Sequence, residues 1–186
     1  MKLATVVFLK KDGKIILSKK KQHIHVGEEK LARSKEIYNG FGGKFDEKAG
    51  DKDIEDTAIR ELNEETGKTN GVFAKKEDLI KIGEIQFFWP NNNSNNPNMF
   101  VYFYLVENFV GYPVETDEMG EPEEFFEEDI PYNQMTGADK EIIPKMLKNK
   151  DTFLKAKVFL LENNEYEIIE EKIENFKEHT LKIKLR

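Results

Sequence analysis

Three glutamates near residue 60 are spaced so that their carboxylates could act together. Glu61, Glu64 and Glu65 stand at positions i, i+3 and i+4, which places them on one face if this segment is a helix. Like charges at i, i+4 cost roughly 0.2–0.5 kcal/mol per pair without a counter-ion. Because Mg²⁺ takes oxygen ligands and bridges readily to phosphates, this face is a candidate metal site for a phosphate-bearing substrate. Arg60, four residues before Glu64, is expected to orient it by a charge-assisted ion pair.

A glycine-rich segment precedes the three glutamates. Gly40, Gly42 and Gly43 fill three of four consecutive positions, which indicates unusual backbone angles. Such a loop lets the backbone approach a helix closely and present a carbonyl oxygen to the same cation. Taken alone, the glutamates would be interpreted as the solvated face of an ordinary acidic helix. The glycine loop is the observation that favours a functional site.

Together, the two segments resemble the Nudix hydrolase family. Residues 60–67, Arg-Glu-Leu-Asn-Glu-Glu-Thr-Gly, match the second half of the Nudix box, and the resemblance extends over about residues 3–174. It is closest to the mammalian-type members that act on oxidised purine nucleoside triphosphates. The resemblance implies an α+β Nudix fold, a mixed β-sheet sandwiched between α-helices, in a single domain over residues 1–186 with a polar tail from about residue 175. It further implies a hydrolase that uses Mg²⁺, with Mn²⁺ as a possible substitute, to cleave substrates such as 8-oxo-dGTP to the monophosphate and pyrophosphate.

The resemblance also implies a set of site residues. For catalysis it implies Arg60, Glu61, Glu64, Glu65 and Glu118, of which the four glutamates and the carbonyl of Gly42 would hold the metal. For the substrate it implies Thr5, Lys20, Asn39, Phe41, Gly42, Gly43, Lys44, Phe87, Trp89, Met119 and Asp139. Two of these assignments have simpler alternatives. Phe87 and Trp89 alternate along an expected strand and would ordinarily belong to the core, and Lys20 could be the solvated end of a strand. His23 and His25 are expected to lie on the surface.

An insertion separates the glycine loop from the helix. Gly43 and Arg60 are 60 − 43 = 17 positions apart, three more than in the family pattern. The first acid of the box is therefore displaced, and Glu47, Asp51 and Asp53 are all candidates to replace it. Because loop entropy grows slowly with length, the insertion is expected to lengthen the loop without moving the helix.

A second departure from the family pattern affects the residues that recognise the purine base of the substrate. Where the relatives carry Trp-Pro-Asp-Asp to recognise the oxidised base, this chain has Thr136, Gly137, Ala138 and Asp139. The stacking Trp and one Asp are missing. Without a neighbouring carboxylate, Asp139 is expected to ionise more readily. The changed run leaves ADP-ribose, a dinucleotide or another modified purine triphosphate as alternative substrates, and the insertion leaves a non-catalytic nucleotide sensor as an alternative function.

Hydrophobic patterning predicts the elements that must position these residues. The first 21 residues are expected to form a hairpin across Asp12-Gly13, and a helix capped by Asp53 is expected to end at Gly67. Further strands are expected at residues 79–89, 99–106, 153–161 and 165–173, and helical spacing recurs over residues 142–147. Residues 22–36 are expected to be a loop, and the asparagine-rich run at 91–97 a surface hairpin tip.

Composition excludes several other classes of protein. The 186 residues carry 29 Lys+Arg and 36 Asp+Glu, for a net charge of −7, and include 14 Phe and 6 Tyr, enough for one sizeable core. The absence of cysteine excludes disulfide scaffolds and thiolate catalysis. No apolar run approaches the ~18 residues of a membrane span, and nothing marks secretion. We therefore expect a cytoplasmic protein, most simply a monomer, that binds a nucleotide rather than a nucleic-acid polymer or a membrane.

Overall fold

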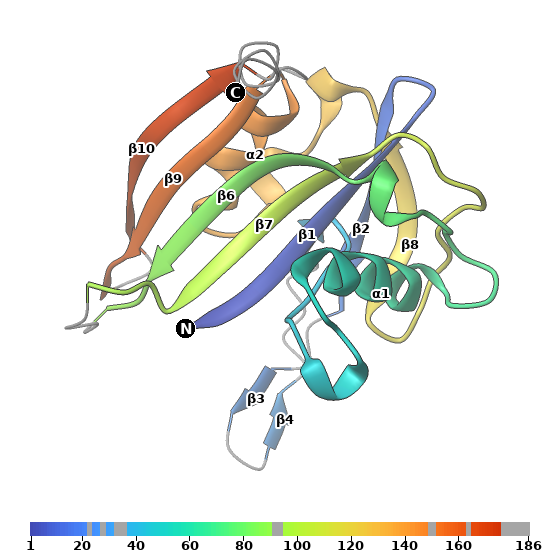
Figure 1. The fold of residues 1–186 in the computed structure, drawn as a ribbon, viewed down its shortest axis with the longest axis horizontal. Helices are drawn as coiled ribbons and strands as arrows, with labels where there is room; N and C mark the ends of the chain where they lie inside the picture. Colours follow the sequence, from blue (N-terminus) through green and yellow to red (C-terminus); the bar gives the residue numbers. More distant parts are fainter. Residues whose placement is uncertain are drawn as a thin grey trace.

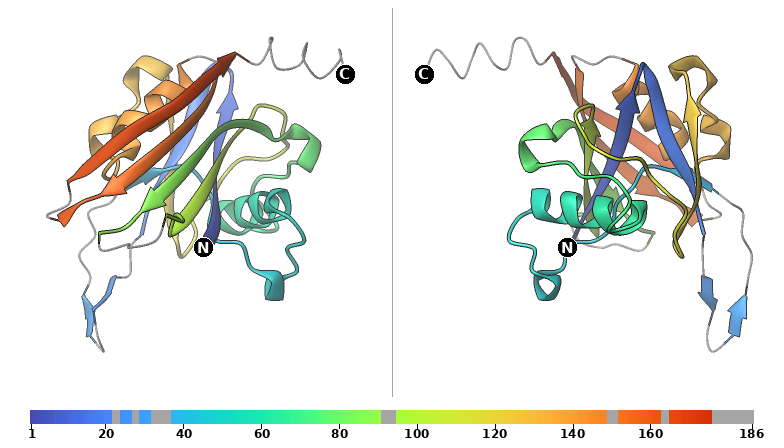
Figure 2. Two further views of the ribbon diagram at one scale, coloured as in Figure 1. Left: turned by 60° about the vertical axis from the view of Figure 1, so that its left-hand side comes forward. Right: turned by 90° about the vertical axis from the view of Figure 1, so that its right-hand side faces the viewer.

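The structure, a computed structural model, describes residues 1–21, 24–26, 29–31, 37–90, 95–148, 152–162 and 165–175. A mixed β-sheet runs through the molecule, with one helix on each side of it (Figures 1 and 2). The elements are β1 (Lys2–Lys11), β2 (Lys14–Lys20), β3 (Ile24–Val26), β4 (Glu29–Leu31), β5 (Ile37–Asn39), α1 (Ile54–Thr66), β6 (Ile80–Phe88), β7 (Met99–Val106), β8 (Met119–Phe125), α2 (Asp139–Leu147), β9 (Thr152–Leu160) and β10 (Tyr166–Asn175), with short 3₁₀ turns at Glu47–Ala49, Lys76–Asp78, Glu127–Asp129 and Tyr132–Gln134.

The main sheet has eight strands in the order β10-β9-β6-β7-β1-β2-β5, with β8 also paired to β2. The pairs β1–β7 and β6–β9 are parallel, and the other pairs in the sheet are antiparallel. This confirms the expected mixed sheet between helices. The expected strands are also present, with ends shifted by two residues or fewer.

Local sequence explains the two elements that carry the site. Asp12 and Gly13 both have positive φ, 52° and 81°, and they close the β1–β2 hairpin as an Asp-Gly turn should. The Asp53 carboxylate accepts a hydrogen bond of 2.8 Å from the N–H of Asp56 and so caps α1. Gly67 ends the helix in the left-handed conformation at φ 113°. Both ends of α1 are therefore where the sequence predicts them.

Alternation along β1 divides the core between the two faces of the sheet. Phe8 belongs to a cluster with Ile142 and Met146 of α2. Its neighbour Val7 belongs to a second cluster that contains Leu62 of α1. Successive side chains of a strand point to opposite faces, so a single strand anchors both helices. This fixes α1, and with it the acidic residues, against β1.

Three features differ from the sequence expectations. Residues 22–36 were expected to be a loop, but within them β3 and β4 form a small two-stranded sheet apart from the main one (Figure 1). It is too short to give a periodic signal. Strand β8 was not expected, because its sequence is rich in glutamate. An edge strand with one solvated face tolerates such residues. Pro144, which the sequence placed near a helix start or a kink, lies inside α2 rather than at its first residue. His23, residues 91–94 and residues 176–186 lie outside the described part of the chain.

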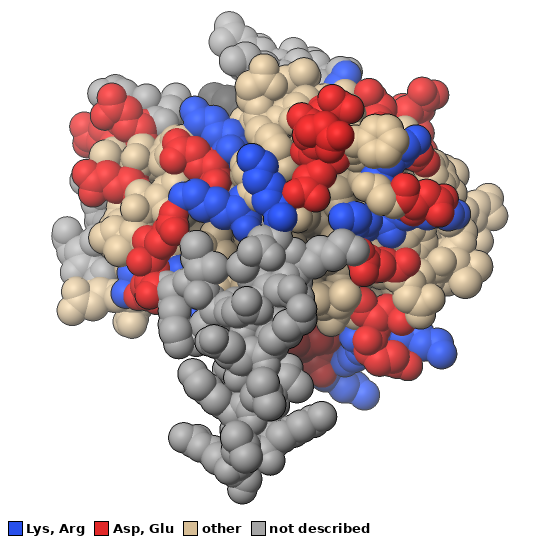
Figure 3. All heavy atoms as spheres, turned by 90° about the horizontal axis from the view of Figure 1, so that it is seen from above, with Lys and Arg blue, Asp and Glu red and all other residues tan. Residues whose placement is uncertain are grey.

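Charged side chains of both signs are interspersed over the face seen in Figure 3. Ion pairs such as Lys155–Glu84 and Lys81–Glu84, each at 3.5 Å, join neighbouring residues of the sheet. Among the helices of the described residues, none combines the length and the hydropathy needed to cross a bilayer.

Candidate active site

The acidic face of α1 forms one wall of a cavity of about 510 Å³, which we call the acidic cavity. Glu61, Glu64 and Glu65 line it, as the helical spacing predicts. The opposite wall is the loop before β8, which contributes Asp117 and Glu118. The Glu118 carbonyl accepts a hydrogen bond of 2.7 Å from the N–H of Lys21, so this loop is tied to the end of β2. The structure thus brings Glu118 to the three helix glutamates from far along the chain.

Glu65 is the most buried of these acids, with 3% of its surface exposed. One carboxylate oxygen accepts a hydrogen bond of 2.5 Å from the N–H of Gly42, and the other lies 2.8 Å from the Lys20 ammonium. Lys20 also reaches the carbonyl oxygen of Gly42 at 3.4 Å. Burial raises the pKa of Glu65, and the Lys20 charge opposes that rise. Lys20 is therefore a counter-charge within the site and not a solvated strand end.

Arg60 holds two of the glutamates in place. One of its terminal nitrogens lies 2.9 Å from Glu61 and 3.1 Å from Glu64, so the expected Arg60–Glu64 pair is present. Its other terminal nitrogen donates to the Lys44 carbonyl at 3.0 Å. Burial raises the pKa of Glu61, and Arg60 opposes the rise. Arg60 thus engages the carboxylates of Glu61 and Glu64, and no three acidic or histidine side chains in the described ranges converge into a ready-made metal shell.

The longer loop before α1 supplies the acid that pairs with Arg60, Asp51. Asp51 is 5% exposed and binds Arg60 through both oxygens, at 2.8 and 2.9 Å. It also accepts hydrogen bonds from the Thr57 hydroxyl at 2.8 Å and from the Asp46 N–H at 3.0 Å. The hydrogen bonds from Arg60 hold the pKa of Asp51 far below its usual range. Of the three candidates for the missing acid, Glu47 lies in an exposed turn and Asp53 caps the helix, whereas Asp51 pairs with Arg60.

The glycine loop fits between β1 and the acidic helix face. It is bonded to β1 from the Thr5 N–H to the Gly43 carbonyl at 2.8 Å. A Cβ on Gly42, at φ 155°, would lie 2.2 Å from the Thr5 carbonyl oxygen. A Cβ on Gly43 would lie 2.4 Å from the carboxyl carbon of Glu61. Gly42 therefore requires glycine, whereas a side chain at Gly43 would push the Glu61 carboxylate out of place.

A second cavity of about 400 Å³, the apolar cavity, lies on the other side of the glycine loop. It contains seven of the residues expected to bind substrate: Thr5, Gly42, Gly43, Lys44, Phe87, Trp89 and Asp139. Its floor adds residues that sequence reasoning missed, including Met99, Val101 and Leu160. Their apolar alternation fits an ordinary core strand, so no sequence signal distinguishes them. Thr5 is 1% exposed, and its buried hydroxyl has no hydrogen-bond partner among the described residues.

Four expected substrate residues do not line this cavity, and one of them, Lys20, pairs with Glu65 instead. Phe41 and Met119 are fully buried and pack in the core cluster beside α1. Asn39 lies in β5, and its side-chain oxygen accepts a hydrogen bond from the Gly40 N–H at 2.9 Å. The alternation of the backbone around the glycine loop turns Phe41 toward the core, which a linear match of motifs does not reveal.

The structure corrects the expectation for Asp139. This residue begins α2, where the Thr136 hydroxyl donates to its carboxylate at 3.1 Å. Although Ala138 removes the neighbouring carboxylate, burial alone raises the pKa of Asp139 to about 6. Sequence reasoning counted the missing charge and overlooked desolvation, which here is the larger effect.

Comparisons with known proteins agree with this geometry. A family model described as the NUDIX domain matches residues 2–148. The chain is 35% identical over 149 residues to the oxidized purine nucleoside triphosphate hydrolase of Danio rerio, covering 80% of this chain and 81% of that protein. The Mus musculus protein of the same name is 30% identical over the same shares of the two chains.

Among solved structures, the mutator MutT protein from Bacillus halodurans has the same fold. It superposes with a TM-score of 0.67 at 16% identity, covering 90% of this chain and 97% of that one. The fold, the acidic helix face beside a glycine loop and the match to the family model agree. This chain is a member of the Nudix family of pyrophosphohydrolases.

Proposed function

We propose that this protein hydrolyses oxidised purine nucleoside triphosphates, such as 8-oxo-dGTP, to the monophosphate and pyrophosphate. The observation that supports this most strongly is the placement of the acidic and apolar cavities on the two sides of one glycine loop, residues 42–44. A base in the apolar cavity would direct its phosphate chain past this loop to the glutamates. The relatives with 30% and 35% identity are named for this substrate class.

We propose that the acidic cavity holds Mg²⁺, or Mn²⁺ in its place. Five of the eight residues that line it carry carboxylates, which are the oxygen ligands that these cations take. Burial raises the pKa values of Glu61 and Glu65, so their negative charges are incompletely compensated by Arg60 and Lys20. Glu61, Glu64, Glu65, Glu118 and the Gly42 carbonyl would supply ligands. When bound, the ion would polarise the phosphate and lower the pKa of a water.

Other side chains of the protein would position the glutamates and the substrate's phosphate chain around the metal ion. Arg60 fixes Glu61 and Glu64 to the helix face, and Asp51 fixes Arg60. Lys20, now paired with Glu65, also reaches the Gly42 carbonyl of the glycine loop and would meet the phosphate chain. Glu118, on the opposite wall, is placed to hold metal or to accept a proton from water.

In the apolar cavity, the Thr5 hydroxyl and Asp139 are the polar groups proposed to read the base. With a pKa of about 6, Asp139 exists partly as the neutral acid near neutral pH, and a neutral carboxyl both donates and accepts hydrogen bonds. It can therefore donate to an oxo group of the base. Trp89 supplies an aromatic face beside it. We propose a monomer that acts on the free nucleotide pool of the cytoplasm.

A hydrolysis panel tests this function. We would incubate the protein with Mg²⁺ and 8-oxo-dGTP, dGTP, ADP-ribose or a dinucleoside polyphosphate, and identify products by anion-exchange chromatography. We expect the highest kcat/KM for 8-oxo-dGTP, with pyrophosphate as a product and a preference over dGTP of about ten-fold, or ~1.4 kcal/mol. Turnover of ADP-ribose without turnover of any triphosphate would overturn the assignment. Tight binding without any turnover would identify a sensor.

A further inference from the structure

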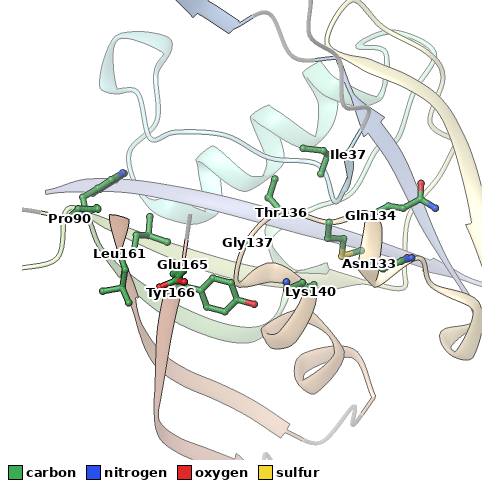
Figure 4. Close-up of a pocket in the computed structure, with 13 residues that line it drawn as sticks. Ile37, Pro90, Asn133, Gln134, Thr136, Gly137, Lys140, Leu161, Glu165 and Tyr166 are labelled. Carbon is green, nitrogen blue, oxygen red and sulfur yellow. The ribbon is translucent and has the colours of Figure 1, made fainter. Parts of the chain in front are cut away.

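A third cavity, which we call the outer cavity, adjoins the apolar cavity and has a volume of about 930 Å³ (Figure 4). Trp89, Thr136, Gly137 and Leu160 line both cavities, so the two share a wall. Ligand pockets in proteins span about 300–1,000 Å³. The apolar cavity is near the bottom of that range and the outer cavity near the top. A plain nucleobase leaves the outer cavity unused.

The shared wall is made partly of small residues. Gly137 has no side chain, and a Cβ built on it would meet nothing within 4 Å. Thr136, the residue before it, also has a small side chain. The described structure therefore offers little bulk at this point to separate a base in the apolar cavity from the outer cavity. Figure 4 shows Thr136 and Gly137 in the middle of the outer cavity's lining, between Gln134 on one side and Leu161 on the other.

The positions of the three cavities indicate which part of a substrate would enter the outer one. The glycine loop, residues 42–44, lines the apolar cavity on the side of the glutamates. Trp89, Thr136 and Leu160 line it on the side of the outer cavity. A phosphate chain directed to the glutamates would extend from the nucleoside toward the glycine loop, away from the outer cavity. What extends into the outer cavity must therefore be attached to the base.

The lining of the outer cavity suits an uncharged aromatic or alkyl group. Trp89 and Leu161 are large apolar side chains that remain 37% and 39% exposed. Tyr166 lines the cavity, and the Lys140 ammonium lies 5.6 Å from the centre of its ring. The Tyr166 hydroxyl is already bonded to Glu141 at 2.5 Å, so the ring rather than the hydroxyl is available for contact. Burying such exposed apolar surface against a ligand is favourable.

We propose that the outer cavity is a subsite for the exocyclic substituent of a modified purine nucleotide, an aryl or alkyl group carried on the far edge of the base. The inference rests on the proposed function, because it assumes a purine in the apolar cavity. It extends the substrate class from oxidised purines to purines with bulky adducts.

Kinetics with a matched pair of substrates test this subsite. We would compare kcat/KM for N⁶-benzyl-dATP and for dATP with Mg²⁺. We expect a ratio of about ten in favour of the benzylated substrate, since even one methylene in a fitting hydrophobic pocket is worth roughly 10–200-fold. A ratio at or below one overturns the proposal.

Variants separate the subsite from the base pocket. Gln134 is exposed and lines only the outer cavity, so Gln134→Trp should obstruct part of that cavity and lower kcat/KM for N⁶-benzyl-dATP about ten-fold, with dATP unchanged within two-fold. Glu121→Trp, at an exposed position of β8 that lines neither cavity, is the matched control and should change neither value. An equal loss for both substrates in Gln134→Trp would contradict the assignment.

A binding measurement distinguishes failure of the subsite from failure of the proposed function. Trp89 is the one tryptophan of the chain and lies on the shared wall, so its fluorescence reports occupancy. N⁶-benzyldeoxyadenosine should change that emission at a concentration about ten-fold lower than deoxyadenosine. If triphosphates are not hydrolysed but this difference is seen, the function fails and the subsite stands. If 8-oxo-dGTP is hydrolysed but the difference is absent, the subsite fails and the function stands.

Discussion

Replacing Asp51 with asparagine tests whether the insertion supports the acidic site. Asp51 is buried, and its two carboxylate oxygens bind one edge of the Arg60 guanidinium. Removing one partner of a buried ion pair destabilises by roughly 3–5 kcal/mol. Asparagine keeps the shape and one accepting oxygen, so we expect a loss near the lower end, about 3 kcal/mol. With a urea m value of roughly 2 kcal/mol/M, the unfolding midpoint should fall by about 1.5 M.

Activity should fall along with stability. Arg60 holds Glu61 and Glu64, and without its Asp51 anchor it no longer fixes their positions. Substituting a group that orients a metal ligand typically costs ~10–100-fold. We therefore expect kcat for 8-oxo-dGTP to fall by about that factor in Asp51→Asn, measured well below the midpoint of thermal unfolding so that the variant is folded.

The pH dependence of stability gives a further check, because the lowered pKa of Asp51 fixes the direction of the change. Arg60 lowers the folded-state pKa of Asp51. The stabilisation is therefore complete above the unfolded pKa of ~3.9 and is lost as the pH falls below it. The difference in unfolding free energy between wild type and Asp51→Asn should be constant from pH 7 to 5 and should narrow toward pH 3.

Asp53→Asn is the matched control for Asp51→Asn. Asp53 is exposed, and asparagine caps a helix about as well as aspartate, so this variant should lose much less stability than Asp51→Asn and keep its activity. If Asp51→Asn loses no more stability or activity than Asp53→Asn, the Asp51–Arg60 pair does not support the site and the reasoning is refuted.

Four other variants, one of them a control, probe the rest of the site. Glu65→Gln keeps shape but removes a charge from the proposed metal site, so hydrolysis should fall at least ~100-fold with circular dichroism unchanged; activity within about three-fold of wild type would contradict the assignment. Gly43→Ala places a Cβ 2.4 Å from the Glu61 carboxyl carbon, so activity should fall about ten-fold or more, whereas Gly50→Ala, where a Cβ meets nothing within 4 Å, should keep its activity and lose only stability. The preference for 8-oxo-dGTP over dGTP should rise as the pH falls through about 6 and Asp139 takes up its proton. Asp139→Asn, neutral at every pH, should show no such change. The raised pKa also means that Asp139 contributes most to stability below its unfolded pKa of ~3.9, and that this contribution is lost as the pH rises through about 6.

Much of the fold and the acidic face could be predicted from sequence because the signals are local. The spacing of Glu61, Glu64 and Glu65, the Asp53 cap and the Asp12-Gly13 turn each depend on a few neighbouring residues. The choice of Asp51 among three acids could not be made, since it depends on where a loop of irregular backbone folds back onto Arg60. The insertion indeed leaves α1 beside Gly43, but it is a structural part of the site and not a neutral extension.

The apolar cavity was predictable only in part for a related reason. Thr5, Phe87 and Trp89 could be matched to the family, but Met99 and Leu160 line the cavity because of long-range strand pairing. The burial of Phe41 and Met119 and the raised pKa of Asp139 follow from three-dimensional surroundings. The spacing of neighbouring residues in the sequence does not reveal these surroundings.

The parallel strand pairs bear on how the protein folds. Lys2 of β1 pairs with Met99 of β7, a separation of 99 − 2 = 97 residues. Ile85 of β6 pairs with Ala156 of β9, a separation of 156 − 85 = 71 residues. Parallel pairing over such separations requires closure of large loops and slows folding. Because β1, β6, β7 and β9 all contribute to the apolar cavity, that cavity forms only when synthesis has passed residue 160. A nucleotide can then stabilise only the completed chain, by mass action, and cannot guide its early folding.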